Sequence, residues 1–181
     1  MSEEAYRLLQ YEGYPSWLYP VKNGATTIWE RLNSYTVKDG FGENNSMNSF
    51  NHYSFGAVAS WMYNYSLGIC RDEKSPGFKH FILKPEVDPT RGITHAEGYY
   101  DSMYGRIRSR WQYTDSGIRY EFTVPANTTA SLYLPAPAVS FISENGKPLK
   151  KASGVRYVSA DKELHHLELA SGSYQFDIKQ K

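Results

Sequence analysis

Two short segments hold the side chains best suited to chemistry. Glu30 lies in GATTIWERL, residues 24–32, and His52 lies in MNSFNHYSF, residues 47–55. A carboxylate near a helix N-terminus is favoured in its ionised, basic form. A neutral imidazole offers one donor and one acceptor, which suits two adjacent hydroxyl groups. Structural interpretations compete: Thr27 and Glu30 have the spacing of a capping box, and a histidine that opens an apolar helix is often a capping or core residue.

Other polar groupings are weaker candidates. Metal ligands occur close together in two places, but exposed strand positions explain them and we predict no metal site: His95 with Glu97, and His165 with His166 and Glu168. Two acidic residues in a Gly-rich loop, Asp39 and Glu43, are interpreted as solvated charges.

One segment carries a ladder of basic residues, and the common nucleotide-binding motifs are absent from the sequence. Arg106, Arg108 and Arg110 alternate along one segment, but a cross-strand Glu121 and the near-zero net charge favour a solvated face over phosphate binding. The chain has no G-x-S-x-G, Walker or G-x-G-x-x-G pattern, so nucleotide and hydride chemistry have no support.

The composition of the chain argues against some classes of binding partner. The chain has 181 residues, with 20 Lys and Arg against 19 Asp and Glu, so we expect no general attraction to nucleic acid or to an anionic membrane. No apolar run reaches the ~18 residues of a membrane span. The segment MSEEAYRLLQ lacks the features of a secretory signal, and the single Cys70 leaves the cellular compartment open. Aromatic residues make up 15% of the chain, and we interpret most of them as packing.

The first part of the chain is predicted to be helical. Apolar residues in 51–68 follow the spacing of an amphipathic helix, which Gly68 ends as a C-cap. Shorter helices are predicted after Ser2 and over Thr26 to Leu32, the latter following a turn at Asn23 and Gly24. The charged, Pro- and Gly-containing segment RDEKSPG at 71–77 is interpreted as a linker, so we divide the chain into 1–72 and 73–181.

The second part has the period of β-strands. Residues 105–113 and 118–124 alternate between apolar and polar, and a turn at 114–117 pairs Tyr113 with Ile118, Trp111 with Tyr120, and Arg110 with Glu121. Further strands are predicted at 78–84, 130–134, 139–143, 155–159, 165–169 and 174–178, with a tight turn at Asn145 and Gly146. Many short strands of this kind predict an antiparallel sandwich.

The segments YPSWLYPVKNG, ATTIWE, MNSFNHY and PGFKHFILKP together resemble the C-terminal portion of bacterial α-L-rhamnosidases. The resemblance covers essentially the whole chain. It implies an α+β, multidomain fold, in which the last helices of an (α/α)6 catalytic barrel are followed by the antiparallel β-sandwich.

The resemblance also implies roles for the two candidates. Glu30 matches the general base that activates water for inverting hydrolysis of a terminal α-L-rhamnosyl residue, and His52 matches a histidine that hydrogen-bonds the sugar. The expected substrate is a rhamnose-containing glycan or glycoside, with no organic cofactor. The general acid of the family lies on a segment upstream of the matched one, so we expect the rest of the barrel as a partner and little hydrolysis by this chain alone.

The sequence is also compatible with two other functions. The sandwich could be a non-catalytic carbohydrate-binding module that uses surface Tyr and Trp, or the helices could belong to another (α/α)6 enzyme. Trp17 and Trp29 could line a sugar site or pack internally.

Overall fold

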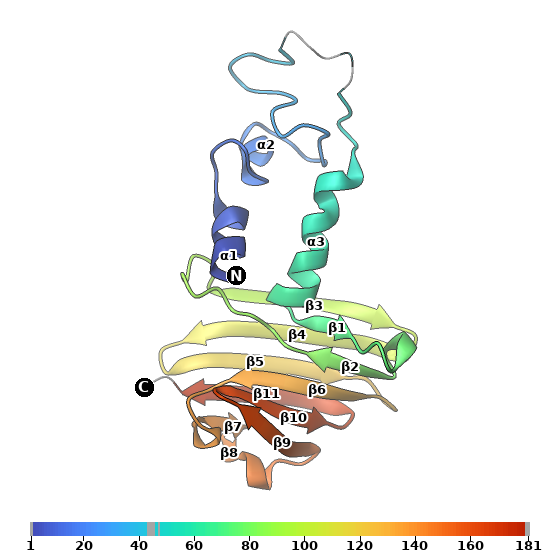
Figure 1. Cartoon of the computed structure of the whole chain (residues 1–181), viewed down its shortest axis with the longest axis vertical. Helices are drawn as coiled ribbons and strands as arrows, with labels where there is room; N and C mark the ends of the chain where they lie inside the picture. Colours follow the sequence, from blue (N-terminus) through green and yellow to red (C-terminus); the bar gives the residue numbers. More distant parts are fainter. Residues whose placement is uncertain (1, 43–45, 47, 180–181) are drawn as a thin grey trace. The chain divides into compact units, whose positions relative to one another are not determined.

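The computed structural model describes residues 2–42, 46 and 48–179, and the chain divides into two compact units. The first, called here the helical unit, comprises residues 1–61 and 88–93. The second, the sandwich unit, comprises residues 62–87 and 94–181. Figure 1 traces both along the chain.

Short helices and long loops build the helical unit. Its helices are α1 (Ser2–Gln10), α2 (Leu18–Lys22), a 3-10 helix (Tyr53–Ala57) and α3 (Val58–Trp61). Tyr6 of α1 is fully buried and packs edge-on against Trp61, with ring centroids 5.0 Å apart. The predicted helix after Ser2 is confirmed.

The helix predicted over 51–68 is confirmed in a segmented form. Helical backbone runs from Tyr53 to Ser66, where a π-helical turn (Met62–Ser66) follows α3. Gly68 then has a φ of +67°, the left-handed conformation expected of a C-cap glycine. An added Cβ there would lie 2.1 Å from the backbone nitrogen of Pro85, so both conformation and space require glycine.

The helix predicted over Thr26 to Leu32 is wrong. No helix occurs in this segment, although the Asn23 and Gly24 turn before it is present, with Gly24 N–H bonded to Val21 O at 3.0 Å. The backbone of 28–30 instead bonds to residues 49–52, and this non-local pairing replaces the local capping box.

Two sheets form the sandwich unit (Figure 1). The five-stranded sheet has the order β1-β2-β6-β10-β9, and the six-stranded sheet has the order β3-β4-β5-β11-β7-β8. The strands are β1 (Ile69–Arg71), β2 (His80–Leu83), β3 (His95–Ser102), β4 (Gly105–Thr114), β5 (Gly117–Val124), β6 (Thr129–Pro135), β7 (Ile142–Glu144), β8 (Lys147–Pro148), β9 (Val155–Asp161), β10 (Leu164–Leu169) and β11 (Gly172–Lys179).

The predicted sandwich and its central hairpin are confirmed. Tyr113 pairs with Ile118, Trp111 with Tyr120, and Arg110 with Glu121. Because successive strand side chains point to opposite faces, the apolar residues of β4 and β5 enter the core. The largest fully buried side chains here are Trp111, Tyr120, Phe81, Phe122, Phe176, Leu83 and Ile107. The turn at Asn145 and Gly146 is also present, with φ of +46° and +73°.

Several details of this unit differ from expectation. β1, β3 and β8 were not predicted, and β2 pairs with β6 in parallel. The strand predicted at 139–143 begins with a 3-10 helix (Val139–Phe141), and only β7 after it is a strand. β1 pairs antiparallel with β2, so the segment 71–77 that was interpreted as a linker connects two strands of one hairpin. The charged, Pro-containing composition fits an exposed hairpin connection as well as a linker. The division of the chain at residue 72 stays a prediction.

Candidate functional site

The two motifs that carry Glu30 and His52 lie side by side in the helical unit. The Glu30 N–H donates to Ser49 O at 2.8 Å, and the His52 N–H donates to Ile28 O at 2.8 Å. These bonds join segments about twenty residues apart in an antiparallel arrangement. The structure therefore brings together the two segments that carry the residues selected from the sequence.

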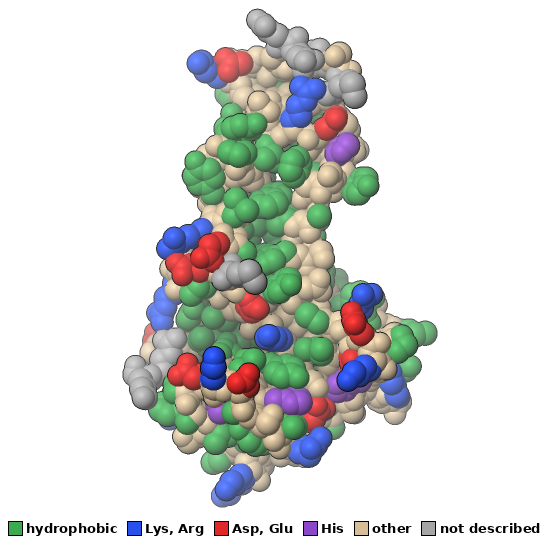
Figure 2. Space-filling view, in the orientation of Figure 1, with side chains coloured by type: hydrophobic (Ala, Val, Ile, Leu, Met, Phe, Trp, Pro, Cys, Tyr) green, Lys and Arg blue, Asp and Glu red, His purple; other side chains and the backbone are tan. Residues whose placement is uncertain are grey.

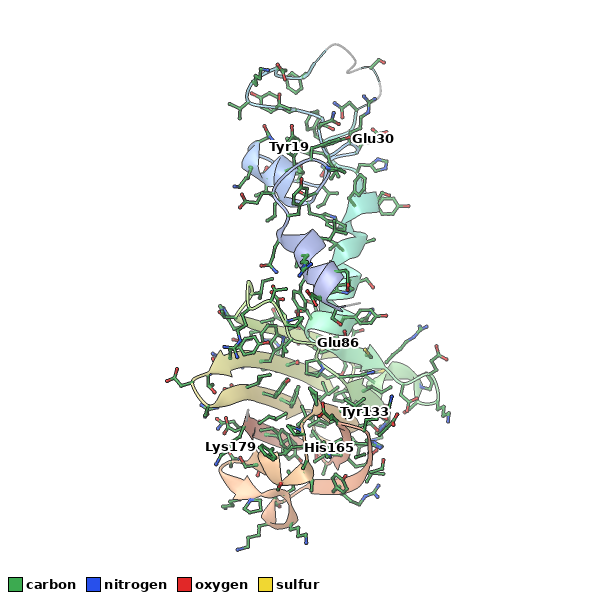
Figure 3. The ribbon with its side chains drawn as sticks, turned by 60° about the vertical axis from the view of Figure 1, so that its left-hand side comes forward. Tyr19, Glu30, Glu86, Tyr133, His165 and Lys179 are labelled. Carbon is green, nitrogen blue, oxygen red and sulfur yellow. The ribbon has the colours of Figure 1, made fainter. Side chains whose placement is uncertain are left out.

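The Glu30 carboxylate is held by the opposite segment. Its Oε2 accepts a hydrogen bond from the Ser49 N–H at 2.8 Å, so Glu30 and Ser49 exchange a backbone bond and a side-chain bond. Figure 3 places Glu30 among the loops of the helical unit. The side chain is half-buried. Because an ionised carboxylate has about four acceptor positions on two oxygens, the bond to Ser49 orients the group and leaves acceptor capacity for a further donor.

Trp29 holds this segment by packing into a cluster of aromatic side chains. Its side chain is 6% exposed and packs edge-on against Phe50 and Tyr35, with ring centroids 5.2 and 6.5 Å away. Phe41 extends the cluster against Phe50. The packing interpretation of Trp29 is therefore supported. Since Ile28 is exposed and Glu30 half-buried, burial alternates along the segment and only Trp29 enters the cluster.

His52 occupies the residue before the 3-10 helix. Its backbone is extended, with φ of −115° and ψ of 109°, and its ring stacks on Tyr53 at 6.2 Å with an angle of 14°. Tyr53 is 90% exposed, while His52 is half-buried. The structural interpretation of His52 as a core residue is thus not supported, and no side-chain capping bond from it is present at this helix.

Two residues missed by sequence reasoning hold the loop between the motifs. Asn48 Nδ2 donates to Ser34 O at 3.2 Å, and the Ser34 hydroxyl donates to Asn48 Oδ1. Ser34 is buried, although a Ser in a loop gives no sequence signal of burial. Asn48 lies in the MNSFNHY motif, so the motif itself was the signal that could have selected it. This pair fixes the distance between the chain after Glu30 and the chain before Ser49.

The remaining candidates have structural roles or lie outside the description. Trp17 Nε1 donates to Phe55 O at 2.9 Å. Asp39 is exposed in a loop turn that Thr36 stabilises, and Glu43 lies outside the described residues.

The histidines of β10 correct one expectation. His165 is only 4% exposed and its Nε2 lies 3.1 Å from Ala136 O, so it is a buried structural residue and not an exposed strand position. His166 stacks on Tyr133 and its Nε2 lies 2.9 Å from Glu168 Oε1. Within the described ranges no cluster of three or more metal-ligating side chains was found, and no helix there is long and apolar enough to cross a membrane.

Both parts of the chain match models of known protein families. Residues 1–66 match the family model of the bacterial α-L-rhamnosidase six-hairpin glycosidase domain, and residues 68–148 match that of the bacterial α-L-rhamnosidase C-terminal domain. The chain belongs to the bacterial α-L-rhamnosidase family. It combines the end of the glycosidase domain with the C-terminal β-sandwich domain, which confirms the fold class predicted from the sequence.

Relatives within the α-L-rhamnosidase family match nearly all of the chain. An α-L-rhamnosidase of Alteromonas sp. (strain LOR) is 37% identical over 175 residues, which cover 96% of this chain and 17% of the relative. An α-L-rhamnosidase of Streptomyces avermitilis is 34% identical over 177 residues, covering 98% of this chain and 16% of the relative. The chain thus spans about a sixth of the length of these relatives.

Solved α-L-rhamnosidase structures share the fold. The Streptomyces avermitilis enzyme in complex with L-rhamnose superposes with a TM-score of 0.83 at 33% identity, over 98% of this chain and 16% of that one. The enzyme from Dictyoglumus thermophilum superposes with a TM-score of 0.80 at 26% identity, over 98% of this chain and 19% of that one.

Proposed function

We propose that this chain supplies the general base and a sugar contact to an inverting α-L-rhamnosidase, which releases terminal α-L-rhamnosyl residues from glycans or glycosides. Glu30 is the base and His52 the sugar contact. The observation that carries the proposal is the backbone pairing that brings the segments of Glu30 and His52 together, with the Glu30 carboxylate oriented by the Ser49 N–H. Family membership and the L-rhamnose held by the Streptomyces avermitilis relative support the substrate class.

The proposed reaction is a single displacement. A water molecule on the Glu30 side attacks the anomeric carbon as its proton passes to the Glu30 carboxylate. The bond to the leaving oxygen breaks as that oxygen takes a proton from a second carboxylic acid. Inverting enzymes keep the two carboxyl groups about 6.5–9.5 Å apart so that the water fits. The described residues supply a matched candidate for the base alone, and the acid is proposed to come from the rest of the barrel.

The rest of the barrel is also the partner that the exposed apolar side chains of the helical unit require. Several large ones are exposed on this unit, and Figure 2 shows hydrophobic side chains at its surface. Among them are Leu8, Tyr14, Val21, Ile28 and Phe55. Because large exposed apolar side chains that gather on one unit often mark an interaction surface, we propose that further barrel helices cover them.

Activity is therefore expected from the assembled barrel, with little hydrolysis by the 181-residue chain alone. General acid catalysis is typically worth about 10² to 10⁴ in rate. Correct positioning of substrate and catalytic groups contributes further. No organic cofactor is needed for this reaction.

A hybrid enzyme tests the base. The chain matches 177 residues of the Streptomyces avermitilis enzyme, so it replaces that segment, and hydrolysis of an aryl α-L-rhamnoside is measured. Glu30→Gln retains an oxygen that accepts from the Ser49 N–H but removes the basic carboxylate. We expect kcat to fall by about 10² to 10⁴.

Glu12→Gln is the matched control, because Glu12 is an exposed glutamate of the same unit that pairs with Lys22. It should leave kcat within about twofold, as expected for an exposed ion pair. Activity of the Glu30→Gln hybrid within about tenfold of the unsubstituted hybrid would remove Glu30 from the base role, since base catalysis is worth at least about 10².

A further inference from the structure

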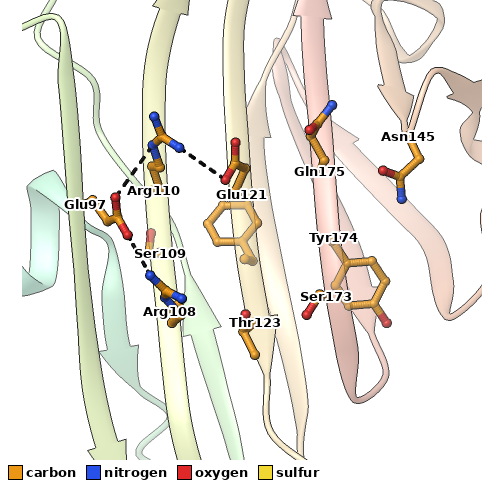
Figure 4. Close-up of a pocket in the computed structure, with 11 residues that line it drawn as sticks. Glu97, Arg108, Ser109, Arg110, Glu121, Thr123, Asn145, Ser173, Tyr174 and Gln175 are labelled. Atoms are coloured by element: carbon orange, nitrogen blue, oxygen red, sulfur yellow. Dashed lines mark hydrogen bonds and ion pairs between the residues drawn. The ribbon is translucent and has the colours of Figure 1, made fainter.

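The outer face of the six-stranded sheet contains an open pocket of about 340 Å³ within the sandwich unit. This volume is at the lower end of the ~300–1000 Å³ of small-molecule sites. Figure 4 shows polar side chains from four strands converging on it. β3, β4, β5 and β11 contribute Glu97, Arg108, Arg110, Glu121, Thr123 and Gln175.

The charges of this pocket are paired and balanced. Arg108 Nη2 lies 2.8 Å from Glu97 Oε1, while Arg110 lies between two carboxylates, 3.8 Å from Glu97 Oε2 and 3.5 Å from Glu121 Oε2 (Figure 4). The pocket therefore holds two cations and two anions. All four side chains are partly exposed, so their remaining donors and acceptors can be reached by a ligand.

The Arg110 guanidinium has an N–H group that does not donate to another described residue. Its Nη2 donates to Gln112 Oε1 at 2.7 Å. Its Nε is shielded from solvent and has no hydrogen-bond partner among the described residues, although the Glu97 carboxylate is nearby. A buried N–H without a partner is unfavourable, so a small movement of Arg110 toward a new acceptor would be favourable.

We propose that this pocket binds a neutral saccharide, as a site separate from Glu30 and His52. Each sugar hydroxyl both donates and accepts, so adjacent hydroxyls can accept from Arg108 or Arg110 while they donate to Glu97 or Glu121. This complements a pocket with alternating cations and anions. An anionic ligand would have to displace a carboxylate from an arginine, whereas a neutral polyol can add to the existing pairs.

The same geometry indicates weak binding. The aromatic side chains that line the pocket are buried: Phe122 is 2% exposed, and Tyr174 is 6% exposed with its hydroxyl bonded to Ala170 O at 2.8 Å. Neither ring is available to stack on a sugar. Binding that rests on hydrogen bonds in an open pocket should have a Kd on the order of 1 mM, which corresponds to about −4 kcal/mol.

Amide NMR of the 181-residue chain tests the proposal. L-rhamnose, D-galactose and D-galacturonate are each titrated to about 50 mM, well above the expected Kd. The two neutral sugars should cause saturable shifts at residues 108–110, 121–123 and 173–175. Arg110→Gln and, independently, Glu121→Gln should each weaken binding about fivefold or more, as expected for the loss of one hydrogen bond.

Arg106→Gln is the matched control. Arg106 is also an outward-facing arginine of β4, but it pairs with Asp101 at 2.8 Å and does not line the pocket. It should leave the affinity within about twofold, because an exposed pair contributes little.

Four results would overturn the saccharide site: shifts that do not saturate, shifts confined to residues 27–53, tighter binding of galacturonate than of both neutral sugars, or an equal loss in Arg106→Gln. Thermal melting of each variant separates a lost contact from a lost fold. If Arg110→Gln unfolds the sheet, Glu121→Gln alone decides.

Discussion

Asp88 provides the sharpest test of how the helical unit is held together. Its side chain is fully buried, and its carboxylate accepts four hydrogen bonds. Oδ2 accepts from Gln10 Nε2 at 2.8 Å and from the Ile93 N–H at 2.8 Å, while Oδ1 accepts from the Thr90 N–H at 2.9 Å and the Thr90 hydroxyl at 2.7 Å. This carboxylate thus joins the end of α1 to residues 88–93.

Replacing Asp88 with Asn should cost about 1–3 kcal/mol, because one backbone N–H then loses its acceptor. The Asn amide has one oxygen, so its NH₂ group must face one of the two donor pairs. The Gln10 amide can flip and the Thr90 hydroxyl can rotate to compensate. The N–H groups of Ile93 and Thr90 cannot, and one of them is left unpaired.

Amide hydrogen exchange at Ile93 and Thr90 measures this cost locally. Since 1.36 kcal/mol is a factor of ten, protection of one of the two amides should fall roughly 5- to 160-fold. Asp161→Asn is the control, because Asp161 is exposed at the end of β9 and should change neither amide. Protection of both amides within about twofold of the unsubstituted chain would refute the assigned role, since even the smallest expected cost is larger.

Acidification should also remove the stabilisation that the Asp88 carboxylate contributes. The direction of this pH dependence follows from the shift in the pKa of Asp88. Burial alone would raise the pKa of Asp88, but the hydrogen bonds from Ile93, Thr90 and Gln10 together hold it below its usual value. A folded-state pKa below the unfolded value gives stabilisation that is present above pH ~3.9 and is lost as the pH falls through the folded pKa. The ¹³C titration of this carboxyl should therefore have its midpoint below the ~3.9 of an unperturbed aspartate.

Three further substitutions test the site and the sandwich. His52→Ala in the hybrid enzyme should raise KM roughly 2- to 12-fold with a smaller effect on kcat, because one sugar hydrogen bond is lost; an unchanged KM would contradict the contact. Trp111→Phe should lower the free energy of unfolding in urea by about 2–4 kcal/mol, because it removes the bond from Trp111 Nε1 to Ser66 O at 2.8 Å and leaves a cavity. Gly68→Ala should lower it by at least about 2 kcal/mol, owing to the positive φ and the contact with Pro85, and an unfolding midpoint equal to that of the unsubstituted chain would argue against both.

The sandwich could be predicted from the sequence because its main signals, alternating apolar residues and short turns, lie within single segments of the chain. The β4–β5 hairpin has clear alternation on both sides of a short turn, so pairing follows from the chain itself. β3 lacks this signal: its sequence HAEGYYDS carries Gly98 and no regular apolar face, and it forms the edge of the sheet. Its strand conformation comes from pairing with β4, and a single segment read alone cannot reveal that.

The candidate site was predictable in its residues but not in its backbone. The family resemblance selected Glu30 and His52, while local pattern favoured a helix with a Thr27 to Glu30 capping box. In the structure the Glu30 N–H is bonded to Ser49 O, a partner nineteen residues away in the chain. The Glu30 carboxylate accepts from the N–H of the same residue, Ser49. Helix propensity is a weak prior that such tertiary bonds override. Orientation of Glu30 therefore depends on the main chain at Ser49 and not on a helix dipole.

Asp88 belongs to the helical unit although it follows β2 in the chain. Residues 88–93 lie between β2 and β3 of the sandwich unit, yet they belong to the helical unit and bind the last residue of α1 through Gln10. The chain thus crosses from one unit to the other three times, after residues 61, 87 and 93. A polypeptide that ended after α3 would lack Asp88 and with it the four hydrogen bonds described above. The C-terminal part of the chain is consequently part of the structure of the unit that carries Glu30 and His52, because it supplies a buried anchor to that unit's first helix.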